Sequence, residues 1–241
     1  MTSHEHVDRT FGHVYRYHSR SDAHSIALCG FVIEDLIDAC PALAAHVRSG
    51  EVAYGINLGF HFPSGKVKNL DLAIGTPTQR AIPGAEGPIR VTELASLRLA
   101  MEAKSVMTEH GKSQPRVFDE LSSSHEIVHQ GGQHTIAAGI TIVNIADRFV
   151  SPLRQNGQDL NWSFHKQPGV TASMVRHLRG LPIRDHEGEV GFDAYATVVI
   201  SCDNQSAASL WTAPPAPQPG ERDHYGTFVA RLADAYTRSF G

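Results

Sequence analysis

The sequence has few cysteines and no surplus of basic charge. Its 241 residues include three cysteines, Cys29, Cys40 and Cys202, an odd number with no CxxC spacing. This pattern argues against a disulfide framework and predicts reduced core thiols in a reducing compartment. The formal net charge is −4, with the 15 His counted as neutral. Any surface that binds nucleic acid must therefore come from local clusters of Lys and Arg.

The sequence also lacks a long hydrophobic run. The longest apolar stretch, IALCGFVIEDLI, is interrupted by Glu34 and Asp35 and is too short to span a bilayer. The N-terminal residues are polar and contain no apolar segment of the kind found in secretory signals. Glycine-rich phosphate loops of the GxGxxG and GxxxxGK[ST] types are absent too. These absences predict a soluble cytoplasmic protein with no membrane partner.

What is present is an alternation of helix and strand patterns. Residues 1–20 are expected to form a loose or strand-like leader. Apolar spacing predicts a helix from Ser21, and Pro41 either ends that helix or starts a short second one. The runs VAYGINLGFHF and VKNLDLAIG flank the turn signal PSGK and predict a β-hairpin. The next elements are expected to be a strand at 96–106, a helix at 112–130 with Pro115 in its first turn, and a buried strand at 135–146.

The pattern weakens after residue 146. A strand is expected at AYATVVISC, an extended and unpacked linker at APPAPQPG, and a terminal helix at YGTFVARLADAYTRSF. The order helix, strand, strand, strand, helix, strand predicts an α/β fold in which helices flank a mixed β-sheet. The chain is thus divided into a leader (1–20), a core (21–146) and a C-terminal elaboration (147–241).

Three charged residues interrupt the apolar strands of this core. In MEAKS, the period of two in a strand places Glu102 and Lys104 on one face and Ala103 on the other. Asp71 is a lone carboxylate among Leu70 and Leu72 on the hairpin. Because buried charges are costly unless they are paired or bound to metal, we expect Asp71 and Glu102 to converge as ligands of Mg²⁺, with Lys104 acting beside them.

Residues 22–146 resemble the PD-(D/E)xK nuclease superfamily, the restriction-endonuclease-like group, in element order, in the Asp after the hairpin and in Glu-x-Lys on the next strand. The resemblance implies that Asp71 and Glu102 bind Mg²⁺, which Mn²⁺ can replace, and that Lys104 is the catalytic lysine. It further implies a type II-like restriction endonuclease that acts on double-stranded DNA as a homodimer, with target recognition or dimerisation in residues 147–241. Glu34 matches an accessory acid of some members. The residue before Asp71 is Leu70, whereas the family name gives proline.

A rival motif lies in the following helix. HEIVH places His125 and His129 on one helical face as candidate zinc ligands, with Glu126 as the base of a metallopeptidase. His134 arrives one position before the place of a third ligand in the extended form of this motif, and a strand follows directly. Alternatively, His125 and His129 are accessory residues of the nuclease or plain surface histidines.

Basic residues flank the predicted centre. Lys66 and Lys68 lie beside the hairpin turn, and Lys112 and Arg116 open the helix after Lys104. These four side chains are candidates for contacts with the DNA backbone, or else solvated charges. A DNA-binding relative of the nuclease fold without catalytic activity is a further alternative.

Overall fold

The computed structural model describes residues 22–79, 88–132, 134–150, 162–186 and 188–241, together with two short strands before them. Its helices are α1 (Ala23–Ala39), α2 (Pro41–Arg48), α3 (His110–Gly131), α4 (Gly169–Leu178) and α5 (Tyr225–Phe240). Its strands are β1 (His6–Val7), β2 (Val14–Tyr15), β3 (Ala53–His61), β4 (Val67–Pro77), β5 (Leu94–Val106), β6 (Ile136–Asn144), β7 (Arg148–Val150), β8 (Trp162–Phe164), β9 (Ala194–Ser201) and β10 (Ser209–Leu210). Apart from β1 and β2, the leader expected at 1–20 lies outside the described residues.

The described chain builds a mixed six-stranded sheet in the order β10-β9-β6-β5-β4-β3. Strands β3, β4 and β5 form an antiparallel meander, and β6 and β9 then run parallel to β5. The first parallel connection passes through α3 and the second through α4. This arrangement confirms the mixed sheet and the element order predicted for the core. Alternating apolar positions and the PSGK turn made that prediction possible, because both are strong local signals.

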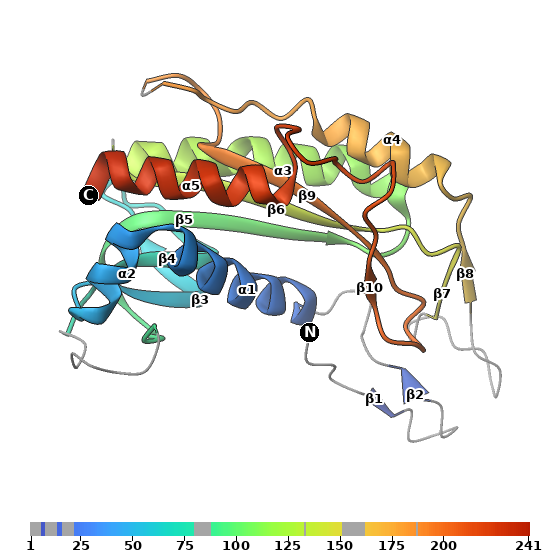
Figure 1. The fold of residues 1–241 in the computed structure, drawn as a ribbon, viewed down its shortest axis with the longest axis horizontal. Coiled ribbons are helices and arrows are strands. Elements are labelled where there is room, and N and C mark those ends of the chain that lie inside the picture. Colours follow the sequence, from blue (N-terminus) through green and yellow to red (C-terminus); the bar gives the residue numbers. More distant parts are fainter. Residues whose placement is uncertain are drawn as a thin grey trace.

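Helices cover both faces of this sheet (Figure 1). Helices α1, α2 and α5 pack on one face over a core that includes Val32, Leu72, Met101 and Phe228. Helices α3 and α4 pack on the other face over a second core. Every residue of β6 is buried, as expected for a central strand covered on both sides. We call the side covered by α1, α2 and α5 the α1 face of the sheet, and the side covered by α3 and α4 the α3 face.

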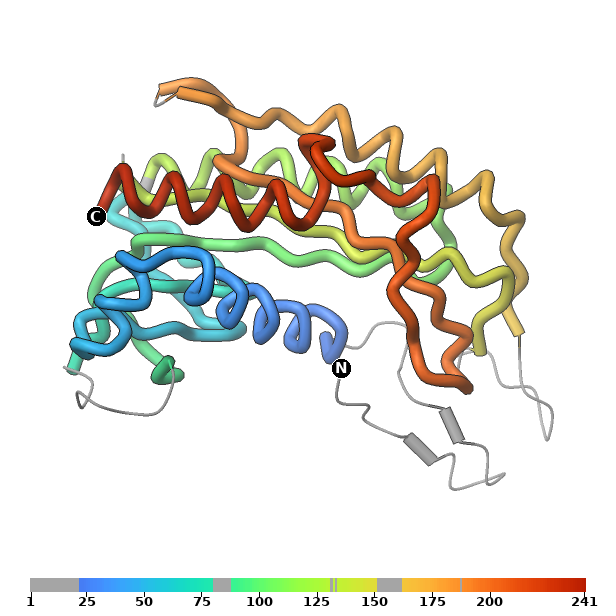
Figure 2. The backbone as a smooth tube through the Cα atoms, in the orientation of Figure 1, coloured from blue at the N-terminus to red at the C-terminus, as the bar shows by residue number. Residues whose placement is uncertain are grey.

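The C-terminal elaboration is part of the same unit. Strand β9 pairs with β6, and α5 runs beside α1 and α2 although almost 200 residues separate them (Figure 2). The His46 ring, on α2, lies 2.9 Å from the hydroxyl of Tyr236 on α5. The prediction of an unpacked linker at 213–220 is wrong, because Ala216 is buried in a small core cluster with Val175 and Val199.

Several other expectations are corrected. Helix α3 begins at His110, so Pro115 lies inside the helix and not in its first turn. Helix α4 and the short strands β7, β8 and β10 were not predicted.

The three cysteines are free and buried, as expected. Within the described ranges, no helix has both the length and the apolar character needed to cross a membrane.

Candidate active site

Asp71 lies at a kink shared by the two strands of the hairpin. The Cα pairing of β3 with β4 includes Ile56↔Leu72 and Leu58↔Leu70, and it passes over Asn57 and Asp71. Leu72 packs on the α1 face but Leu70 on the α3 face, although residues two apart on a regular strand share a face. Asn57 has a φ of 52°, a left-handed conformation that Asn tolerates better than most residues. In both strands, the side chains before and after this point therefore alternate between the two faces of the sheet in opposite phase.

The kink directs the Asp71 carboxylate toward the neighbouring strand. Its Oδ2 accepts a hydrogen bond of 2.7 Å from the backbone N–H of Ala103, the residue between Glu102 and Lys104 on β5. The Cα pairing of β4 with β5 begins at Leu72↔Met101, one residue after Asp71, so Asp71 itself is not paired with β5. On α1, the thiol of Cys29 donates to the Asp71 carbonyl oxygen at 3.4 Å. The structure thus brings Asp71 to the Glu-x-Lys segment, as the sequence predicts.

Glu102 and Lys104 point together toward helix α3, and Ala103 packs in the opposite core. Lys104 Nζ lies 2.6 Å from Glu102 Oε1 and 3.3 Å from Glu120 Oε2 on α3. Glu102 is 8% exposed. A carboxylate so deeply buried requires strong partners, and this one is held by cations on two strands.

The second cation is Lys68, which the sequence indicated only as a candidate DNA contact. Its Nζ lies 3.0 Å from Glu102 Oε2 and donates to the hydroxyl of Ser124 on α3 at 2.6 Å. The same hydroxyl donates to Glu102 Oε2 at 3.3 Å. Lys68 shares the α3 face with Leu70, two residues along β4. It is therefore inside the cluster and not on an open basic surface.

A stripe on α3 lines this cluster and extends beyond it. Lys112, Arg116, Glu120 and Ser124 recur every four residues, so they follow one ridge of the helix. Arg116 Nη1 lies 3.0 Å from Glu120 Oε1, and Lys112 is exposed beside Glu109. Sequence reasoning did not identify Glu120 or Ser124; the spacing of four from Arg116 was the available signal. The basic end of the stripe leads outward from the cluster.

The two carboxyls of the cluster have opposite shifts in pKa. Burial and the nearby charge of Glu102 raise the pKa of Asp71, and the hydrogen bond from Ala103 only partly offsets them. Burial also raises the pKa of Glu102, but the charges of Lys68 and Lys104 outweigh it and hold that pKa below its usual range. Burial lowers the pKa of Lys104, yet Glu102 raises it more, so Lys104 is a stable ammonium at neutral pH.

The donor set of this cluster fits a hard divalent cation. Mg²⁺ prefers oxygen ligands and is often held by only one or two protein carboxylates, with water and substrate completing its shell. Asp71 and Glu102 supply such oxygens, and a cation would relieve the repulsion that raises the pKa of Asp71. Over the described ranges, no group of three or more His, Cys, Asp or Glu side chains could hold a metal ion, so a closed cage of protein ligands is not found there.

Other predicted residues lie outside the cluster. Glu34 is exposed on α1, and it is five residues, or about 140° around a helix, from Cys29, which contacts Asp71. The structure therefore does not bring Glu34 to the carboxylates. Lys66 is exposed in the hairpin turn. A DNA contact by Lys66, Lys112 or Arg116 stays a prediction.

The histidines of HEIVH belong to a separate polar cluster around Asp193. His125 is buried with its ring edge-on to Phe192, at 5.1 Å between centroids. His129 Nε2 lies 3.3 Å from Asp193 Oδ2. The same carboxylate accepts hydrogen bonds from Arg184 Nε at 2.8 Å and from the backbone N–H of Ala137 at 2.8 Å. These contacts give the two histidines packing partners, and the parts of the chain described here supply no three-ligand zinc site.

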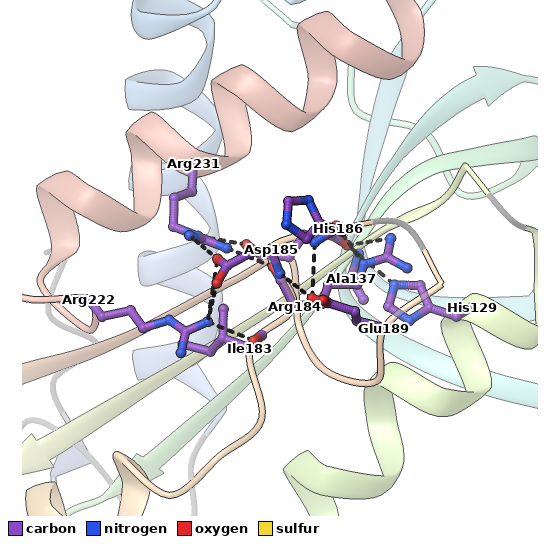
Figure 3. Close-up of polar contacts among 10 residues, drawn as sticks. His129, Ala137, Ile183, Arg184, Asp185, His186, Glu189, Arg222 and Arg231 are labelled. Carbon is purple, nitrogen blue, oxygen red and sulfur yellow. Dashed lines mark hydrogen bonds and ion pairs between the residues drawn. The ribbon is translucent and has the colours of Figure 1, made fainter.

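Figure 3 shows the polar contacts by which the loop before β9 is joined to α3, α5 and β6. Arg231 reaches from α5 to the carbonyl oxygen of Arg184 and to Asp185 Oδ1, at 2.8 and 2.9 Å. Arg222 donates to the carbonyl oxygen of Ile183 at 2.6 Å. The network fastens the loop before β9 to α3, α5 and the N-terminal end of β6, which is a structural role.

Comparison of the chain with protein-family models, with curated proteins and with solved structures finds no match in any of the three.

Proposed function

We propose that the protein is a metal-dependent nuclease that hydrolyses phosphodiester bonds in DNA. One observation carries the proposal: at a kink in the sheet, the Asp71 carboxylate accepts a hydrogen bond from the backbone between Glu102 and Lys104, which pair with each other. Two carboxylates and a lysine are a set of groups suited to phosphodiester hydrolysis. The observed element order agrees with the PD-(D/E)xK resemblance of the sequence, and the proposal rests on the site and not on a relative.

Each residue of the centre has a role that follows from its surroundings. Asp71 and Glu102 would hold Mg²⁺, or Mn²⁺ in its place, which when bound supplies Lewis-acid polarisation of the phosphoryl group. Because its pKa is raised, Lys104 acts as a cation and hydrogen-bond donor that orients the attacking water and offsets charge on the phosphate. Glu120 holds Lys104 from α3 and limits its rotation.

Double-stranded DNA is the substrate that we propose, because the basic end of the α3 stripe leads away from the centre. Lys112 and Arg116 would contact backbone phosphates, which fixes the position of the duplex but carries no sequence information. Cutting both strands suits two symmetric sites, so we propose a restriction-type endonuclease that acts as a homodimer.

The test is cleavage of mixed plasmid and phage DNA with Mg²⁺, with Mn²⁺ and with EDTA. Wild type is expected to cut with either ion and not with EDTA. Lys104→Ala is expected to lose at least about 100-fold in cleavage rate while still binding DNA. Arg48→Ala, an exposed charge at the end of α2, is the matched control and is expected to cut normally. Equal cleavage by wild type and Lys104→Ala would reject this centre.

A further inference from the structure

Lys68 is a second lysine on the same carboxylate. Its side chain is only 18% exposed, and its ammonium contacts Glu102 Oε2 at 3.0 Å and Ser124 Oγ at 2.6 Å. Lys104 holds the other oxygen, Oε1, at 2.6 Å. Both oxygens of Glu102 are thus occupied by lysines that come from different strands.

A divalent cation would require one of the same oxygens. Mg²⁺ binds carboxylate oxygens at about 2.0–2.1 Å and imposes a strict octahedral geometry. A lysine ammonium on that oxygen opposes it by charge and by position. Both lysines have a second anchor, Glu120 for Lys104 and Ser124 for Lys68. Lys68 makes the longer contact with Glu102, 3.0 Å against 2.6 Å, so it is the lysine that we expect to leave.

We propose that Lys68 competes with the divalent cation for Glu102 and, once displaced, directs its ammonium to the scissile phosphate. The inference rests on the proposed nuclease function for its second part alone. The first part, competition for Glu102, is a property of the protein and the ion and requires no substrate.

The charges of the cluster support the second part. Asp71 and Glu102 are balanced by Lys68 and Lys104, and Glu120 is balanced by Arg116. A bound divalent cation then leaves two positive charges in excess. An attacked phosphodiester and its hydroxide nucleophile carry two negative charges together. Without Lys68, one of those negative charges would have no counterpart beside Glu102, which is only 8% exposed.

The hydrogen-bonding capacity of Lys68 points the same way. An ammonium group has three N–H donors. Within the described ranges, Nζ of Lys68 has two acceptors, Glu102 and Ser124. Displacement from Glu102 leaves Ser124 as its anchor and makes two donors available for phosphate oxygens. Ser124 is therefore a positioning residue, because it acts through Lys68.

The first arm of the test measures binding of Mg²⁺ and of Ca²⁺ by titration calorimetry in the absence of DNA. Lys68→Met is expected to bind these ions about three- to tenfold more tightly, since it removes a competing cation. Lys68→Arg retains the charge and is expected to resemble wild type. Arg48→Met, at the exposed end of α2, is expected to have no effect. A purely structural lysine gives the opposite sign, because its loss would loosen Glu102 and weaken ion binding. Unchanged or weaker binding by folded Lys68→Met overturns the inference.

The second arm measures single-turnover cleavage at saturating Mg²⁺ and saturating DNA. Lys68→Met is expected to lose about 100-fold in rate, with partial recovery in Lys68→Arg and little change in DNA affinity. Tighter ion binding together with a normal cleavage rate would overturn the phosphate role. If wild type cuts no nucleic acid, the nuclease proposal and the phosphate role both fail, and the sign of the ion-binding change still decides the competition. Thermal unfolding of each variant excludes misfolding as the cause.

Discussion

Replacement of Asp193 by alanine is expected to destabilise the protein strongly without touching the candidate centre. The Asp193 side chain is 12% exposed and that of Arg184 is 9% exposed. Its carboxylate accepts two hydrogen bonds from Arg184, at 2.8 and 3.1 Å, and one from Ala137 N at 2.8 Å. In Asp193→Ala the guanidinium of Arg184 stays buried and loses the only carboxylate that it contacts in the described structure.

The expected loss follows from that geometry. Removing one partner of a buried ion pair costs about 3–5 kcal/mol, because the other charge is left uncompensated. In a protein of this size, 1 kcal/mol corresponds to about 2–4 °C in the unfolding midpoint. Asp193→Ala should therefore lower the midpoint by roughly 10 °C. Asp185→Ala is the matched control. Asp185 pairs with Arg231 in the same network but is 59% exposed, so its loss should lower the midpoint far less than the loss of Asp193.

The pH dependence gives this prediction a second check. Burial raises the pKa of Asp193, but hydrogen bonds from His129 and Arg184 outweigh it and the net shift is downward. A carboxyl with a depressed folded-state pKa stabilises the fold above its unfolded value, about 3.9, and this contribution is lost as the pH falls further. The difference in unfolding midpoint between wild type and Asp193→Ala should therefore shrink below about pH 4.

Thermal unfolding followed by circular dichroism, from pH 3 to pH 7, measures both effects. Equal midpoints for Asp193→Ala and Asp185→Ala would refute the reasoning. Loss of tightly bound zinc from Asp193→Ala would instead indicate that His125 and His129 form a metal site.

Two further predictions concern the centre and the helix beside it. Because burial and Glu102 raise the pKa of Asp71, its ionised form destabilises the fold at neutral pH. Asp71→Asn should therefore raise the unfolding midpoint at pH 7, lose any stabilisation by Mg²⁺ and stop cleavage; a lower midpoint would contradict the sign of the shift. His125→Ala should lower the midpoint, since the ring packs on Phe192, yet leave cleavage per folded molecule unchanged. A folded but inactive His125→Ala would show that the ring belongs to the chemistry.

The fold of residues 22–146 can be predicted from the sequence, because the signals for its helices and strands are local. The PSGK turn and the apolar alternation on either side predict the hairpin, and β-branched residues predict β6. The sequence does not reveal how APPAPQPG packs, because proline-rich composition is typical of extended linkers. Tertiary packing buries Ala216 of this segment in a cluster with Val175 and Val199, and no local pattern indicates it.

The candidate site likewise has residues that the sequence reveals and one that it does not. Asp71, Glu102 and Lys104 are visible in the sequence, because each is a charge in a strand that is otherwise apolar. The position of Lys68 is not visible, since it depends on the kink that changes the alternation between Leu70 and Leu72. No local rule marks that kink except an Asn that tolerates positive φ.

The aspartate of the candidate centre is held differently from the aspartate of the loop network. Asp71 and Asp193 are both largely removed from solvent, and both accept a backbone N–H, from Ala103 and Ala137. Asp193 has Arg184 as a direct partner and its pKa is lowered, whereas Asp71 faces Glu102 and its pKa is raised. A network built only for stability would pair each carboxylate, as it does for Asp193. Carboxyls with a raised pKa are common at functional sites, which supports the proposal that a cation binds beside Asp71.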